Sequence, residues 1–234
     1  MTLAPEASRF YDTTGLWWGD PGIRDSGREV AARLAPAAGR SPLCVLELGA
    51  GRGGAAAAAA DLGHRVVAIE ASPVRAAMAR SHTRVPRQGR LTVVEADFYE
   101  VEVAGPFDVV AYWNGFGIGS DRDQRRLLER IRGWLRPDGL VLMHVYDPEW
   151  WRAHDGRRRR EGELIQEIGF LRDERSLVDR WWPEDRPADA VSERIRCYSE
   201  DHLRALLTGT GLALRASTRD EGSPWKYLVE LRPA

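Results

Sequence analysis

The fold expected for this chain is decided by the stretch LCVLELGAGRGGAAAAAADLGHRVVAIEASP, Leu43–Pro73. It begins with an apolar run, Leu43–Leu46, which predicts a strand that is buried on both faces. A glycine-rich segment follows, and six consecutive alanines then predict a helix that can approach a sheet closely. A second apolar run, residues 66–69, ends at Glu70. The order of strand, glycine loop, helix and strand predicts an open α/β sheet with parallel strands.

The glycines of this stretch are compatible with two kinds of ligand, or with a turn that binds none. Gly49, Gly51 and Gly54 satisfy the G-x-G-x-x-G pattern, which lets a backbone approach a dinucleotide pyrophosphate. Glu47, however, stands two residues before Gly49, at the carboxyl end of the expected strand. A carboxylate there repels a pyrophosphate and attracts a cation, so a ligand with an ammonium group is favoured. Glu70, 21 residues after Gly49, can accept hydrogen bonds from ribose hydroxyls.

The pattern Glu47-x-Gly49-x-Gly51-x-Gly53, followed by Glu70, resembles the nucleotide-binding core of class I S-adenosylmethionine-dependent methyltransferases. The resemblance implies that Glu47 holds the methionine amino group of this cofactor, directly or through water. It also implies that the glycines allow close approach of the methionine moiety and that Glu70 binds the ribose. The expected cofactor is therefore S-adenosylmethionine, with S-adenosylhomocysteine as the product. The implied fold is Rossmann-like α/β, a seven-stranded, mostly parallel sheet with helices on both faces.

Two later strand ends extend the resemblance. Asp97 and Phe98 follow the expected third strand, residues 91–96; in the family an acid here bonds the adenine amino group and the next residue packs on the ring. An aspartate that simply ends a strand is the alternative. Asn114 follows the expected fourth strand, residues 107–113, at the topological switch point, where it can face cofactor or acceptor. The residues expected to bind the cofactor are Tyr11, Trp18, Glu47, Gly49, Ala50, Gly51, Glu70, Ala71, Asp97, Phe98 and Asn114.

The end of the expected fifth strand, residues 140–146, carries the candidate catalytic groups. His144 and Tyr146 lie in this strand and Asp147 follows it, at a place where a general base is useful. A histidine inside a strand is more often a core residue, which is the alternative for His144.

The first 25 residues are rich in both aromatic and turn-forming side chains. Tyr11, Trp17 and Trp18 are interspersed with glycine, aspartate and proline, a mixture too rich in turn formers for one long helix. The segment either packs the N-terminus onto the core or forms a lid over the cofactor. Residues 26–34 then show helical spacing of apolar side chains.

A second β-rich region, residues 150–198, interrupts the pattern before the last helix. Three runs, residues 164–171, 176–182 and 190–197, predict antiparallel strands that form a lid over the acceptor site. The basic run Arg157–Arg160 is interpreted as a solvated turn. A helix capped by Ser199 and two closing strands complete what we expect to be a single domain, residues 1–234.

Seven of the nine tryptophans of the chain lie at expected strand ends or in the two covering segments. If they converge on one crevice, they form an aromatic chamber for the acceptor; ordinary burial is the alternative. The residues expected to line this pocket are Trp17, Trp113, Trp150 and Trp182.

Composition limits the partners. Lys+Arg at 34 and Asp+Glu at 35 give a net charge of −1, so no broad basic field favours nucleic acid. No apolar run is long enough to predict a membrane span, and no N-terminal segment resembles a signal peptide, so a cytoplasmic protein is expected. We expect no metal site. The sequence leaves the oligomeric state open, a homodimer included.

Three functions are compatible with these observations. The favoured one is methyl transfer to an O, N or C nucleophile of a small, aromatic or hydrophobic molecule of secondary metabolism. Alignment and exclusion of water can supply most of the acceleration, so no strong base is obligatory. The alternative is an S-adenosylmethionine-binding partner or regulatory protein without activity. A nicotinamide-dependent oxidoreductase comes last, because it requires a pyrophosphate beside Glu47.

Overall fold

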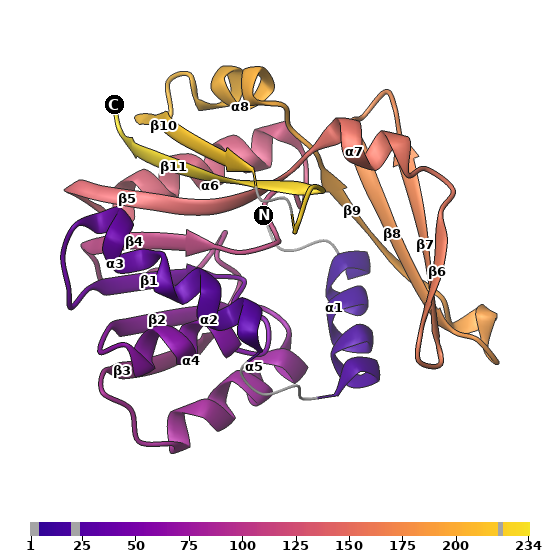
Figure 1. Cartoon of the computed structure of the whole chain (residues 1–234), viewed down its shortest axis with the longest axis horizontal. Coiled ribbons are helices and arrows are strands. Elements are labelled where there is room, and N and C mark those ends of the chain that lie inside the picture. The colour runs from indigo at the N-terminus through magenta and orange to yellow at the C-terminus, as the bar shows by residue number, and fades with distance from the viewer. Residues whose placement is uncertain (1–4, 20–23, 220–221) are drawn as a thin grey trace.

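The computed structural model describes residues 5–19, 24–219 and 222–234, and its centre is a seven-stranded sheet (Figure 1). The strands of this sheet are β1 (Cys44–Leu48), β2 (Arg65–Glu70), β3 (Arg90–Glu95), β4 (Phe107–Tyr112), β5 (Leu135–Tyr146), β10 (Leu212–Arg219) and β11 (Lys226–Pro233). Their order is β10-β11-β5-β4-β1-β2-β3. All neighbouring pairs from β5 to β3 are parallel, whereas β11 is antiparallel to both of its neighbours. The expected seven-stranded, mostly parallel sheet is therefore confirmed.

The central strands are covered on both faces, as their continuous apolar sequences predict. Val45 and Val109 belong to one cluster of buried side chains, whereas their chain neighbours Leu46 and Val110 belong to another. Successive side chains of a strand point to opposite faces, so the two clusters are the two cores of a three-layer structure. Ala56–Ala60 are buried, which lets their helix lie close to the sheet.

Helices cover both faces of the sheet. They are α2 (Asp25–Ala32), α3 (Leu34–Ala38), α4 (Gly54–Asp61), α5 (Pro73–Ser81), α6 (Asp121–Trp134) and α8 (Glu200–Leu207), whereas α7 (Pro148–Ala153) packs against β7 and β8 of the second sheet. In Figure 1, α2, α3 and α4 lie in front of the sheet and α6 lies behind it. The cap expected at Ser199 is confirmed and Ser72 caps α5 in the same way, since each hydroxyl accepts a backbone N–H from the first turn of its helix. Within the described ranges, no helix combines the length and apolar character needed to cross a membrane.

The first element corrects an expectation. Residues 5–18, which include much of the segment interpreted as irregular, form one helix, α1 (Pro5–Trp18). It packs against β9 and α5, between the two sheets (Figure 1). Gly15 allows α1 to lie close to α5, because a Cβ added at this position would lie only 3.2 Å from Val74 Cγ1. Tertiary packing therefore outweighs a weak local propensity. Residues 1–4 and 20–23 of the expected lid lie outside the described residues.

The inserted region has one strand more than the sequence predicts. The strands β6 (Arg158–Glu161), β7 (Leu164–Leu171), β8 (Ser176–Pro183) and β9 (Val191–Arg196) form a separate antiparallel sheet. The additional strand β6 occupies the arginine run that was interpreted as a turn. All its side chains are exposed, so it lacks the apolar alternation that marks a strand. It is an edge strand, a place where charged side chains prevent further strand pairing.

We predict that Gly53→Ala destabilises the fold more than Gly63→Ala does. Both glycines have left-handed backbone conformations, with φ of +77° and +88°. A Cβ at Gly53 lies 2.8 Å from the Ala79 Cβ, whereas a Cβ at Gly63 meets nothing within 4 Å. Chemical denaturation should show a loss of about 3 kcal/mol for Gly53→Ala and about 1 kcal/mol for Gly63→Ala. Equal losses would contradict the proposed contact between the loop and α5.

Candidate functional site

A cavity of about 370 Å³ opens at the carboxyl ends of the parallel strands. It is called the first cavity below. The chain reverses its direction of winding between β1 and β4, and such a point is where open α/β sheets bind ligands. The structure brings all the residues expected to bind the cofactor to this one cavity. Its walls include Tyr11, Trp18, Glu47, Gly49, Ala50, Gly51, Glu70, Ala71, Asp97, Phe98 and Asn114.

The loop after β1 is shaped by glycines and fastened to β2. Gly49 and Gly51 both have φ of +57°, a region that favours glycine. The Ala50 N–H donates to the Ile69 carbonyl at 2.9 Å, and the Gly51 N–H donates to Glu70 Oε2 at 2.6 Å. A Cβ at Gly51 meets nothing within 4 Å. The loop thus presents bare backbone to the first cavity, which suits close approach of a ligand.

Two buried carboxyl groups border the first cavity. Glu47 is 3% exposed and Glu70 is 6% exposed. Burial raises the pKa of Glu47 to about 8, and the negative charge of Glu70 adds to the effect. Burial also raises the pKa of Glu70, although N–H groups of Ser72 and Gly51 oppose the shift by donating to its carboxylate. A cationic ligand group beside Glu47 would remove this electrostatic cost.

Asp97 and Phe98, which follow β3, form another part of the wall of the first cavity. Phe98 is buried, with its ring centroid 5.4 Å from that of Tyr112 in an edge-to-face arrangement. Asp97 accepts the Tyr99 N–H through Oδ1 at 2.8 Å, which fixes the turn after β3. Tyr112 also limits the loop, because a Cβ on Gly49 would lie 3.2 Å from its ring.

A polar cluster of Asn114, His144 and Lys226 closes another side of the first cavity. Lys226 Nζ donates to Asn114 Oδ1 at 2.7 Å, and His144 Nδ1 lies 3.0 Å from the same oxygen. Burial lowers the pKa of His144 to about 3, with the charges of Lys226 and Arg33 adding to the effect. His144 is therefore neutral at pH 7. A group with so low a pKa is a weak proton acceptor, so the cluster is suited to hydrogen bonding rather than to general base chemistry.

The three candidate catalytic residues are not brought together. His144 lines the first cavity, whereas Tyr146 lines a second one and donates its hydroxyl to the Asn114 carbonyl at 2.9 Å. Asp147 lines neither cavity. It caps α7 by accepting the Glu149 N–H at 2.8 Å, and it pairs with Arg219. Its position at the end of β5 is thus explained by a structural role.

The second cavity has a volume of about 610 Å³ and lies beside the first. Trp18, Arg24 and Arg52 border both cavities, so the two spaces adjoin. The walls come from α1, from the region around α7, and from the inner face of the four-stranded sheet. Its aromatic lining consists of Trp18, Tyr146, Trp150, Trp151, Trp181 and Trp225.

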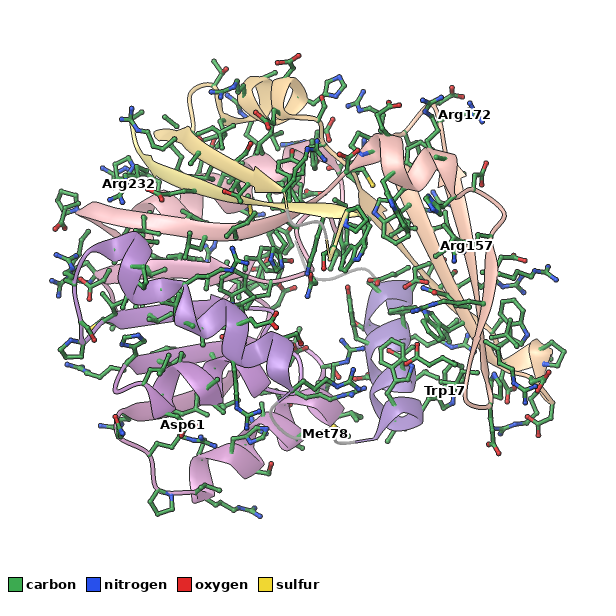
Figure 2. The ribbon with its side chains drawn as sticks, viewed as in Figure 1. Trp17, Asp61, Met78, Arg157, Arg172 and Arg232 are labelled. Carbon is green, nitrogen blue, oxygen red and sulfur yellow. The ribbon has the colours of Figure 1, made fainter. Side chains whose placement is uncertain are left out.

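The four tryptophans expected in the acceptor pocket separate in the structure. Trp150 lines the second cavity, and Trp113 lines the first, where its ring centroid lies 5.2 Å from that of His144. Trp17 lines neither cavity and packs in the cluster between α1 and the second sheet (Figure 2). Trp182 is also absent from both linings, and Trp181 takes its place.

The exchange of Trp182 for Trp181 follows from strand alternation. Neighbouring side chains of β8 point to opposite faces of the sheet. Trp181 faces α1, with its ring centroid 5.1 Å from that of Trp18. Trp182 lies on the other face beside the guanidinium groups of Arg158 and Arg180.

Sequence reasoning missed several residues that border the two cavities. Lys226 carried a signal, because it is the only lysine in a chain with 34 basic residues. Trp225 also carried a signal, since it begins the expected last strand, residues 225–231. Nothing in the sequence marked Asp179 or Glu193, because an acidic residue that alternates with apolar residues in a strand is expected to face solvent. Both belong to the lining of the second cavity.

The strand order and the position of the first cavity define a Rossmann-like α/β protein with a cavity at its topological switch point. Comparison with known proteins agrees. Residues 23–217 match the family described as "Methyltransferase domain". The cypemycin N-terminal methyltransferase of a Streptomyces species is 32% identical over 142 residues, which are 56% of this chain and 57% of the relative. The match thus spans little more than half the length of that relative.

Solved structures share the fold at low sequence identity. The CcbJ methyltransferase from Streptomyces caelestis matches with a TM-score of 0.76 and 22% identity, covering 92% of each chain. S-adenosylmethionine-bound CalS10, an amino pentose methyltransferase from Micromonospora echinaspora, matches with a TM-score of 0.65 and 19% identity, over 90% of this chain and 92% of that one.

The chain belongs to the methyltransferase domain family, whose model matches most of its length. The glycopeptide N-methyltransferase MtfA, which shares the fold at 22–23% identity, has been solved with S-adenosylmethionine and with S-adenosylhomocysteine.

We predict that Glu47→Gln stabilises the protein when no cofactor is present. Between pH 4.5 and about 8, the folded protein keeps a proton on Glu47 that the unfolded chain has lost. The contribution of Glu47 to the free energy of unfolding therefore falls as the pH rises through this window. The gain from Glu47→Gln should grow from pH 5 to pH 8, reaching about 1–3 kcal/mol, and then level off.

Denaturant unfolding at four pH values between 5 and 9 measures this effect. Glu163→Gln removes an exposed carboxylate and serves as the control, for which we expect no pH-dependent gain. A gain from Glu47→Gln that is constant with pH would refute the raised pKa.

Proposed function

We propose that the first cavity binds S-adenosylmethionine and that the second holds a small acceptor, to which the methyl group is transferred. The single observation that carries this proposal is that two adjoining cavities share the Trp18, Arg24 and Arg52 side chains. The cofactor supplies an activated methyl group on a sulfonium, whose transfer needs an aligned nucleophile and little else. A site with two compartments can provide that alignment.

The residues of the first cavity fit each part of the cofactor. Glu47 is buried and forms no ion pair among the described residues, and its raised pKa favours a ligand ammonium group. Glu70 already accepts two backbone N–H groups and has the acceptor oxygens that ribose hydroxyls require. We assign the adenine edge to Asp97 and the ring contact to Phe98. The bare backbone at Gly51 leaves room for the methionine moiety.

Proton removal is a minor part of the proposed mechanism. His144 is a weak base because its pKa lies near 3, and Asp147 is held by the helix cap and by Arg219. We therefore assign His144 a positioning role, in which it holds Asn114 beside the cofactor together with Lys226. Exclusion of water and close placement of the nucleophile would then supply the acceleration.

The acceptor is proposed to be a small molecule of secondary metabolism with an aromatic or hydrophobic part. A space of about 610 Å³ with tryptophan and tyrosine walls suits a drug-sized ligand. The names of two relatives refer to a peptide N-terminus and to an amino pentose, which makes nitrogen a reasonable nucleophile. A non-catalytic S-adenosylmethionine-binding protein remains the alternative, and methyl transfer to candidate acceptors would separate the two.

Glu47→Gln and Gly51→Val should both lose cofactor affinity while remaining folded. The first removes a charge partner of the amino group, which is worth about 10- to 100-fold in the dissociation constant. The second places a branched side chain in the space that we assign to methionine. Gly63→Val has a similar backbone strain far from the cavity, so it should bind normally. Calorimetric titration with S-adenosylhomocysteine measures the result, and unchanged affinity in both loop variants would refute the assigned site.

Cofactor binding should change tryptophan fluorescence through Trp18. Trp18 borders both cavities, whereas its neighbour Trp17 borders neither. Titration with S-adenosylhomocysteine should therefore give a smaller emission change in Trp18→Phe than in the wild type, and an unaltered change in Trp17→Phe. If the two variants behave alike, α1 does not cover the cofactor in the way proposed here.

A further inference from the structure

Two carboxyl groups face each other at the wall of the second cavity. Asp179 on β8 and Glu193 on β9 are direct partners in the antiparallel register, and both line the cavity. Like charges directly opposite each other on neighbouring strands destabilise a sheet. Glu193 is only 8% exposed, so water does little to reduce this cost. A group of opposite charge between the two carboxyls would remove it.

The hydrogen bonds of this pair are incomplete. Asp179 Oδ1 accepts from the Gln166 side chain at 2.6 Å. Glu193 Oε2 is buried and, among the described residues, has no hydrogen-bond partner. A buried acceptor without a donor is costly, and such groups are rare in folded proteins. The Tyr11 hydroxyl is hydrogen-bonded to the Glu193 carboxyl, so Oε2 is the oxygen left to accept from a ligand.

Two neighbouring arginines use their N–H groups elsewhere and do not donate to Glu193 Oε2. Arg75, on α5, donates to the Tyr11 carbonyl and to the Thr14 hydroxyl. Arg159, on β6, donates to the Gln166 side chain and pairs with Glu161.

Burial raises the pKa of Glu193 to about 8, and the charge of Asp179 adds to the effect. The Tyr11 hydroxyl and Arg75 only partly offset it. Burial also raises the pKa of Asp179, with Gln166, Trp181 and Arg159 acting in the opposite direction. Arg24, Arg52, Arg157 and Arg159 line the same cavity, but among the described residues no hydrogen bond or ion pair joins an arginine to Asp179 or Glu193.

Aromatic rings complete the surroundings. Trp150, Trp151, Trp181 and Trp225 line the same cavity as the two carboxyls. Trp150 and Trp151 are in edge-to-face contact, with ring centroids 4.6 Å apart. The faces of indole rings attract cations, most strongly where water is excluded. Carboxylates and indoles together are a combination that recognises an organic ammonium group.

We propose that Asp179 and Glu193 form a subsite for an amine of the acceptor, bound as its ammonium ion among the tryptophans of the second cavity. This inference rests on the proposed function, because it concerns the acceptor compartment of that site. The amine donates to Glu193 Oε2 and lies between the two carboxylates, while the remainder of the acceptor contacts the indoles. The subsite selects amines over alcohols of the same shape, because an alcohol brings no charge to balance the pair.

The test compares 2-phenylethylamine with 2-phenylethanol, which differ only in the amine and hydroxyl groups. Each is titrated calorimetrically into the full-length protein saturated with S-adenosylhomocysteine. The wild type should bind the amine at least about tenfold more tightly than the alcohol. Glu193→Gln and Asp179→Asn should each reduce this preference to about threefold or less. Glu163→Gln, an exposed carboxylate in the same inserted region, should retain the full preference.

Circular dichroism and the affinity for S-adenosylhomocysteine show whether each variant is folded. Equal affinity for the two probes in the wild type, or no detectable binding of the amine, would overturn the proposal. A preference that persists in both carboxyl variants would overturn it as well. If the wild type fails to bind S-adenosylhomocysteine, the assigned cofactor site is wrong instead. A protein that binds S-adenosylhomocysteine without preferring the amine refutes the amine subsite alone.

Discussion

The connection between the glycine loop and the second strand is the constraint on which the site depends. The Gly51 N–H donates to Glu70, and the Ala50 N–H donates to the carbonyl of Ile69. These bonds hold the loop after β1 against the end of β2, so that α4 begins beside the first cavity. They also hold Glu70 near Glu47, where its charge adds to the effect of burial in raising the pKa of Glu47. The same contacts therefore influence both the backbone geometry and the electrostatics of the first cavity.

The parallel core was predictable because its signals are local and redundant. Each buried strand is a short apolar run, and helices begin at serines that cap them. Two elements were not predictable for reasons of packing. Helix α1 contains turn-forming residues and is stabilised by contacts with α5 and β9, which lie far away in the sequence. Strand β6 consists of exposed, charged residues, and only its pairing with β7 makes it a strand.

The two cavities of the candidate site also differ in how far the sequence predicts them. The first cavity was predictable because its residues stand at fixed offsets from strand ends and glycines, as Glu47 and Asp97 do. The second cavity is built from an insertion whose register the sequence does not determine. A shift of one residue exchanges the two faces of a strand, which is why Trp181 lines the cavity where Trp182 was expected. The opposition of Asp179 and Glu193 depends on this register as well.

Buried acids in the two cavities carry a common physical meaning. Glu47 with Glu70, and Asp179 with Glu193, place two carboxyl groups close together where burial raises their pKa values. Such pairs weaken the unliganded fold, since each proton or charge must be accommodated away from water. The apolar clusters on both faces of the main sheet tolerate that loss. A ligand with one positive charge for each pair would recover the stability and bind more tightly for that reason. The electrostatic cost of the buried pairs is thereby linked to selectivity for cationic groups in both cavities.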